Sequence, residues 1–132
     1  MVWKVSVAAK PCKLLSTNQI KAATGSSAVA VDATLSNASQ CYWSVAGAKG
    51  TFAQLNIAMY RPAQVGTLKS SLNQSDPSSV QDGTYPIGSG FSAKIDVLLH
   101  GGGFVLDGSG TIKKGDWAPV LAALANEVSA HL

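Results

Sequence analysis

Apolar and polar residues alternate over residues 91–99, which is the pattern of a β-strand with one buried face. Every second residue from the start of this segment is apolar, while Ser92, Lys94 and Asp96 occupy positions between them. The segment is therefore predicted to be a strand whose apolar face covers the core and whose other face carries charges.

A second strand is expected to follow directly. The segment His100–Gly103 has the glycine content of a turn, and residues 104–113 again contain apolar residues at strand spacing. We therefore expect a hairpin over residues 91–113. The run Asp107–Gly110 contains two glycines and indicates a bulge or a bend in the returning strand.

Three more strands are predicted earlier in the chain. Residues 51–60 alternate between apolar and polar positions, residues 41–46 carry Tyr42 and Trp43, and residues 28–35 show a weaker strand pattern. The pattern thus predicts about five strands in all.

A short helix is predicted over residues 16–24. Ser16 is suited to the N-cap position, and Gln19 three residues later would complete a capping box. Gly25 is expected to end the helix in a left-handed conformation.

The strongest helical pattern lies at the C-terminus. Asp116 is suited to cap this helix, and Pro119 falls in its first turn, where a missing N–H has no cost. One apolar stripe is expected to face the sheet, made by Val120, Leu121, Leu124, Ala125 and Val128.

The middle of the chain contains a short helical pattern over residues 64–72, followed by residues 73–90, which are rich in Ser, Gly, Pro and Asp. We expect the latter to be a long surface loop, and long loops in compact domains are often functional. Taken together, the elements predict one α+β domain over residues 1–132. Its antiparallel sheet of about five strands would be covered by N- and C-terminal helices.

Composition narrows the function classes. The chain has 132 residues, a formal net charge of +3 and a charged fraction of 13%, about half the usual share. Its lysines are scattered, and Arg61 is the single arginine, so we expect no nucleic-acid partner. Lysines near the start, Lys4, Lys10, Lys13 and Lys21, give that end a mild attraction for anionic headgroups or cell-wall polymers. No apolar run is long enough for a membrane span.

Two cysteines, Cys12 and Cys41, leave two interpretations open. They can be buried thiols that act as small hydrophobic groups, or they can form a disulfide. The disulfide is favoured, because Cys12 precedes the first helix and Cys41 opens a strand, so that a bond would join the helix start to the sheet. A metal site is not expected, since there is no CxxC motif.

No catalytic constellation is recognisable. The segment His100-Gly101-Gly102-Gly103-Phe104 is similar to the oxyanion-hole segment of some esterases, but no G-x-S-x-G nucleophile motif accompanies it. A hairpin turn explains the glycines without any chemistry. We therefore expect a protein that is not an enzyme and that needs no cofactor and no metal.

The aromatic residues suggest a binding site. Ordinary core packing explains most of them, but a pocket between sheet and helix would be lined by such side chains. The candidate pocket residues are Trp43, Tyr60, Tyr85 and Phe91, with Trp43 and Tyr85 at its mouth.

Several short motifs support a family resemblance. The chain has Pro11-Cys12-Lys13-Leu14-Leu15-Ser16, then a helix ending in Gly25, and then Cys41-Tyr42-Trp43. This pattern resembles the small secreted or lipid-anchored bacterial proteins of the DUF3558 type, and the closing run 116–132 is similar to their C-terminal helix. The resemblance implies a disulfide between the two matching cysteines, a secreted or envelope location and no established reaction.

These observations lead to a functional expectation. We expect a non-enzymatic binding or interaction module of the bacterial cell envelope, periplasmic or extracellular, whose partner is a small molecule or an envelope protein, and which is a monomer or a homodimer. The first residues lack the apolar core of a signal peptide, so we expect either a mature N-terminus with an added Met or a cytosolic protein. The alternative function is a small cytosolic ligand-binding protein or enzyme accessory with an aromatic-lined pocket.

Overall fold

The computed structural model of the chain describes residues 11–73, 75–76, 79–99 and 102–130. The expectations for Lys4, Lys10 and His100 lie outside these residues. In the described part, the α+β class is confirmed, because six strands form one antiparallel sheet that is accompanied by three α-helices. No helix in this part is long and apolar enough to cross a bilayer.

The secondary-structure elements follow the order helix, three strands, helix, three strands, helix. The strands are β1 (Val29–Val31), β2 (Gln40–Ala46), β3 (Phe52–Tyr60), β4 (Gly83–Ser89), β5 (Ser92–Leu99) and β6 (Gly102–Ser109). The helices are α2 (Thr17–Thr24), α3 (Pro62–Leu72) and α4 (Trp117–Ala130), with short 3-10 turns η1 (Pro11–Lys13) and η2 (Ala48–Gly50).

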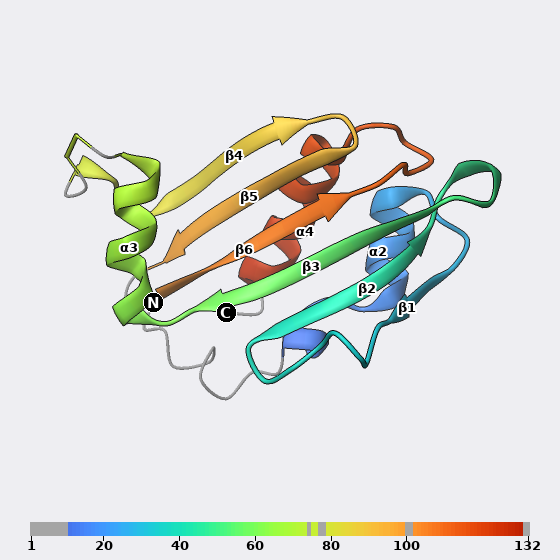
Figure 1. Cartoon of the computed structure of the whole chain (residues 1–132), viewed down its shortest axis with the longest axis horizontal. Helices are drawn as coiled ribbons and strands as arrows, with labels where there is room; N and C mark the ends of the chain where they lie inside the picture. Colours follow the sequence, from blue (N-terminus) through green and yellow to red (C-terminus); the bar gives the residue numbers. More distant parts are fainter. Residues whose placement is uncertain (1–10, 74, 77–78, 100–101, 131–132) are drawn as a thin grey trace.

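The sheet consists of two three-stranded meanders placed side by side. Its strand order is β1-β2-β3-β6-β5-β4, and all neighbouring strands are antiparallel. Helix α3 links the two meanders and lies across one end of the sheet, whereas the β2–β3 and β4–β5 turns and the connection from β6 to α4 lie at the other end (Figure 1).

One face of the sheet is covered by α2 and α4 (Figure 1). Apolar strand residues on this face alternate with mostly polar residues on the other face. Burial of the apolar residues therefore fixes the register of each strand. The largest fully buried side chains of this core include Trp43, Leu55, Ile57, Phe104, Leu106, Trp117, Leu121 and Leu124.

The predicted caps of the N-terminal helix are confirmed. The Ser16 hydroxyl accepts a bond of 3.1 Å from the Gln19 N–H, and the Gln19 side-chain oxygen accepts one of 2.8 Å from the Ser16 N–H. Gly25 ends α2 with a φ of 76°, a left-handed conformation that favours glycine. At α4, Asp116 accepts a bond of 3.0 Å from the Ala118 N–H, as expected of a capping aspartate.

The interpretation of residues 73–90 as one long surface loop is wrong, because residues 83–89 form strand β4. This strand pairs only with β5 and lies at the sheet edge. Most of its side chains are exposed, so it needs little apolar alternation, and an edge position tolerates Pro86, which cannot donate a ladder bond. Tyr85 therefore lies on a strand and not in a loop.

Two other strands are shorter in the structure than the sequence predicts. The predicted strand over 28–35 is limited to Val29–Val31, because the Asp32 carboxylate accepts bonds from the N–H groups of Thr34 and Leu35 and turns the chain there. The returning strand of the hairpin covers 102–109 and not 104–113.

Glycine at position 108 has a different role from the predicted bulge or bend. The β5–β6 and β3–β6 ladders are regular through Gly108, which pairs with Ala93 and Leu55. A Cβ atom on Gly108 would lie 2.3 Å from the Trp117 ring. The glycine therefore lets the indole of α4 lie directly on the sheet.

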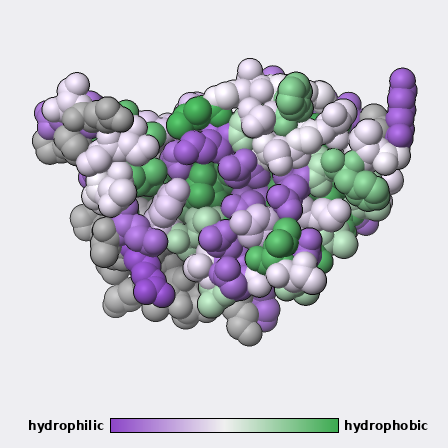
Figure 2. All heavy atoms as spheres, in the orientation of Figure 1, coloured by the Kyte–Doolittle hydropathy of each residue, from purple (hydrophilic) through white to green (hydrophobic). Residues whose placement is uncertain are grey.

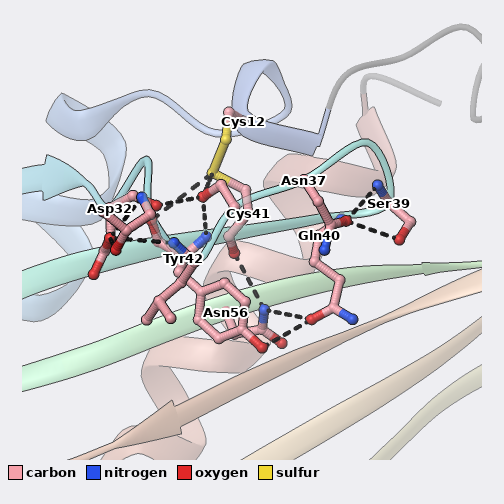
Figure 3. The surroundings of a disulfide bond; sticks show 11 residues. Cys12, Asp32, Asn37, Ser39, Gln40, Cys41, Tyr42 and Asn56 are labelled. Carbon is pink, nitrogen blue, oxygen red and sulfur yellow. Dashed lines mark hydrogen bonds between the residues drawn. A yellow bond between two sulfur atoms is a disulfide. The ribbon is translucent and has the colours of Figure 1, made fainter.

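The disulfide between Cys12 and Cys41 is present and joins η1 to β2. Figure 3 shows that it lies beside a polar network formed by the β1–β2 connection. In that network the Asn37 side-chain oxygen accepts bonds from the N–H groups of Ser39 and Gln40, at 2.9 and 3.1 Å. The crosslink and these bonds together hold the start of β2.

Candidate ligand-binding cleft

The face of the sheet away from α2 and α4, here called the open face, carries polar side chains in its centre. Strand register places Lys94, Asp107, Asn56 and Tyr42 side by side across four strands. Figure 2 looks onto this face and shows hydrophilic atoms concentrated in its middle. Such a row is expected on a sheet face that contacts water or a polar ligand.

Asp96 lies in the next row of the open face, between Tyr85 on β4 and Val105 on β6. It is 0% exposed, which is unusual for a carboxylate. The Tyr60 hydroxyl lies 3.5 Å from its Oδ1, and the Lys94 ammonium lies 3.8 Å from its Oδ2. Within the described residues, Oδ2 has no hydrogen-bond partner.

Burial has the largest effect on the pKa of the Asp96 carboxyl group. It raises the pKa of Asp96, and the positive charge of Lys94 offsets only part of that effect. Burial and the neighbouring Asp96 carboxylate raise the pKa of Tyr60 to about 12, so this phenol stays protonated at neutral pH.

Helix α3 forms the wall of a cleft over this part of the open face. Its residue Leu68 packs with Leu98 and Val80, and Tyr60 and Tyr85 border that small apolar cluster. Pro62 begins the helix, and the Gln64 side-chain oxygen accepts a 2.8 Å bond from the Arg61 N–H and so caps its first turn.

Two hollows adjoin each other on either side of Tyr60 and Gln64, which line both. The first has a volume of about 500 Å³ and is also lined by Thr67, Leu68, Ser71 and Lys94. The second has a volume of about 390 Å³ and is also lined by Ser39, Gln40, Ala58, Met59 and Arg61. Both volumes are in the range of sites for small molecules.

The four candidate pocket residues do not come together. Tyr60 and Tyr85 border the same apolar cluster, and both are neighbours of Asp96. Trp43 is 0% exposed and lies in the core on the helix-covered face, while Phe91 lies at the β4–β5 turn, at the end of the sheet away from α3.

Sequence reasoning did not identify Asp96 as a site residue. It placed Asp96 with Ser92 and Lys94 on the polar face of the strand, which agrees with the observed register. What it did not reveal is that this polar position becomes fully buried, with the Tyr60 hydroxyl of a distant strand beside it. The apolar residues Val97 and Leu98 follow Asp96 directly, but a carboxylate beside apolar residues is common in strands and gives no signal of burial.

Replacement of Asp96 by asparagine is expected to stabilise the protein at neutral pH. A carboxyl group with a raised folded-state pKa stabilises the fold below its unfolded pKa and costs stability as the pH rises through its folded pKa. Asp96→Asn removes that cost and should raise the free energy of unfolding by about 1–2 kcal/mol at neutral pH. This gain in the free energy of unfolding should vanish as the pH falls below 3.8, the ordinary pKa of an aspartate side chain. Urea unfolding across this pH range measures it, and a less stable variant at neutral pH would contradict the expectation.

The described residues contain no group of three or more His, Cys, Asp or Glu side chains placed to hold a metal ion. The polar groups that line the two hollows are an ammonium, a guanidinium, amides and hydroxyls, which are suited to hydrogen bonds with a small polar molecule. Comparisons with protein-family models, with curated proteins and with solved structures gave no match to this chain.

Proposed function

We propose that this protein is a non-enzymatic binding module of the bacterial cell envelope, and that its cleft between α3 and the open face binds a small polar molecule. The observation that carries the proposal is the Asp96 carboxylate. It is fully buried, and its Oδ2 has no hydrogen-bond partner among the described residues. An unmet acceptor of this kind is costly, and function is a common reason for its presence.

The chemistry of the cleft selects the ligand class. Oδ2 accepts a hydrogen bond, so the ligand supplies a hydroxyl or an ammonium group at this point. Tyr60 and Lys94, which line the larger hollow, are also the two residues that contact Asp96. Asp96 itself lines neither hollow, so a ligand donor reaches the carboxylate only when the side chains of Tyr60 and Lys94 move apart. The amide of Gln64 and the guanidinium of Arg61 supply further polar groups in the adjoining hollow.

The location in this proposal is supported by the disulfide. Cys12 and Cys41 are bonded, and disulfides persist mainly in oxidising compartments such as the periplasm and the extracellular space. This favours an envelope protein over the alternative of a cytosolic pocket protein, in which both thiols would be reduced.

Ligand screening by NMR tests the function. The ¹⁵N-labelled protein is titrated with a library of polyols, amino sugars and small amines, and amide shifts are followed. We expect hits to move the signals of Tyr60, Gln64, Lys94 and Asp96 together. Asp96→Asn should weaken binding of a hit by about tenfold to a hundredfold, because it removes a charge-assisted hydrogen bond.

A matched control uses a carboxylate from the other side of the molecule. Glu127 is exposed on α4 and accepts a bond of 2.9 Å from the Gln19 side chain. Glu127→Gln should leave the affinity of every hit unchanged. Hits whose affinity is the same for the wild type and for Asp96→Asn would refute the proposed site, and a measurable turnover of a hit would refute a purely binding role.

A further inference from the structure

The end of the sheet away from α3, here called the loop end, combines exposed aromatic side chains with lysines. It consists of residues 47–52, 89–92 and 110–116, which are the β2–β3 turn with the first residue of β3, the β4–β5 turn with one strand residue on each side, and the whole connection from β6 to α4. These segments lie together at the right of Figure 1. None of them takes part in the cleft described above.

Two phenylalanines project from this end. Phe52 is 72% exposed and Phe91 is 71% exposed, which are high values for large apolar side chains. They lie on opposite sides of Gly110, whose N–H donates a 2.8 Å bond to the Phe91 carbonyl, while a Cβ on Gly110 would lie 2.9 Å from the Phe52 carbonyl oxygen. Figure 2 shows apolar atoms at this edge of the open face.

The backbone beneath these side chains is held in place. The Asp116 carboxylate accepts a 2.8 Å bond from the Gly90 N–H, and the Gly90 carbonyl accepts one of 2.8 Å from the Trp117 N–H. The turn that carries Phe91 is thereby tied to the start of α4. The exposed position of Phe91 is therefore a consequence of the fold, and its aromatic side chain contributes little to the core.

Two of the three segments of the loop end contain lysines. Lys49, Lys113 and Lys114 are exposed in the loop end, and Asp116 is its single acidic residue. Lys49 and Lys113 also line one hollow of about 320 Å³ together with Ser27 and other small residues. The side chain of Lys114 reaches the end of α2, where its ammonium lies 3.3 Å from the Ala22 carbonyl. The loop end thus combines a net positive charge with two exposed phenylalanines.

We infer that the loop end docks onto the surface of an anionic lipid bilayer. Phe52 and Phe91 enter the boundary between headgroups and acyl chains, where aromatic side chains are favoured, and the lysines lie at the level of the phosphates. The hollow between Lys49 and Lys113 would receive a headgroup phosphate. Because α3 lies at the other end of the sheet, a molecule docked in this way keeps its cleft away from the lipid (Figure 1).

The charge of this surface favours lipid over a second copy of the chain. In a symmetric dimer through the loop end, the lysines of one copy would meet those of the other, and like charges brought together oppose association. An anionic bilayer offers both an apolar layer for the phenylalanines and a negative layer for the lysines.

Vesicle cosedimentation tests the inference. The full chain, with its disulfide intact, is mixed with vesicles of equal parts phosphatidylglycerol and phosphatidylcholine, or of phosphatidylcholine alone. We expect binding to the anionic vesicles, falling with added salt, and weak binding to the neutral ones. Phe52→Ala and Phe91→Ala should each lower the partition coefficient by about tenfold. The double variant Lys49→Gln/Lys113→Gln should lower it by about twentyfold or more.

Matched controls carry the same chemical changes elsewhere. Leu35 is 46% exposed between β1 and β2, and Lys69 lies in α3, so Leu35→Ala and Lys69→Gln should bind vesicles like the wild type. Asp96→Asn should also bind normally, which separates this test from that of the cleft. Absence of binding to anionic vesicles would overturn the inference, as would equal losses in the control variants. Self-association of the wild type without lipid that Phe91→Ala abolishes would also overturn it, and would identify a contact between copies instead.

Discussion

Reduction of the Cys12–Cys41 disulfide is expected to lower the free energy of unfolding by about 3–4 kcal/mol. The two cysteines are 29 residues apart, and the crosslink restricts the unfolded chain more than the folded one. The loss would be a large part of the stability of a domain of this size. Urea unfolding with and without a reductant measures the difference, and mass spectrometry after alkylation confirms the state of both thiols.

The control for this experiment is a chain that has no thiols. Cys12→Ala/Cys41→Ala should unfold at the same urea concentration with and without the reductant, at a midpoint close to or below that of the reduced wild type. Cys41 is fully buried, so its truncation adds a small cavity cost. If the wild type kept its midpoint after complete reduction, the proposed role of the crosslink in stability would be wrong.

Replacement of Gly108 by alanine is expected to destabilise the protein by about 3 kcal/mol or more. The new Cβ atom would lie 2.3 Å from two carbons of the Trp117 ring, closer than non-bonded atoms can approach. The ring has little freedom to move away, because Trp117 is fully buried and its Nε1–H donates a 2.9 Å bond to the Gly110 carbonyl. Chemical denaturation measures the loss.

A second glycine provides the matched control. Gly66 lies in α3, and a Cβ atom there would meet no other heavy atom within 4 Å. Gly66→Ala should therefore stabilise the protein by about 0.5–1 kcal/mol through its effect on helix propensity. In addition, Trp117→Leu should cost less stability in the Gly108→Ala background than in the wild type, because the clash is then relieved. Additive losses would show that the two positions do not meet.

The stability and binding effects expected at Asp96 have opposite signs. Asp96→Asn should make the protein more stable at neutral pH and at the same time weaken its ligand. Such opposition is common where a binding site keeps a buried charge that the fold does not need. The combination is informative, because a residue with a purely structural role would not show both effects.

The sequence predicted most of the regular elements because their signals are local. The Ser16–Gln19 capping box and Gly25 set the bounds of α2, and strict alternation marked 51–60 and 91–99 as strands. Strand β4 was missed for the same reason. An edge strand pairs on one side only, and most side chains of β4 are exposed. Its segment therefore shows no clear alternation of apolar and polar residues, and its Gly, Pro and Ser residues resemble those of a turn.

The candidate site was much less accessible from sequence. Aromatic residues were the only signal used, and they selected Trp43, which lies in the core, together with Phe91, which lies at the loop end. Tyr60 and Tyr85 were selected by the same reasoning and do border the cleft region. Aromatic side chains are equally suited to a core, a pocket and an exposed tip, so residue type alone does not separate these places.

By itself, the sequence determined the α+β class, the caps of α2 and α4 and the faces of β3 and β5, because periodicity and caps act over a few residues. The tertiary structure alone decided which polar position becomes buried and which glycine faces a ring. Asp96 is fully buried beside Tyr60 from β3, while Gly108 meets Trp117 from α4. These contacts join segments that are distant in the chain, and their effect on burial, pKa and packing exists only once the strands are paired and the helices are docked.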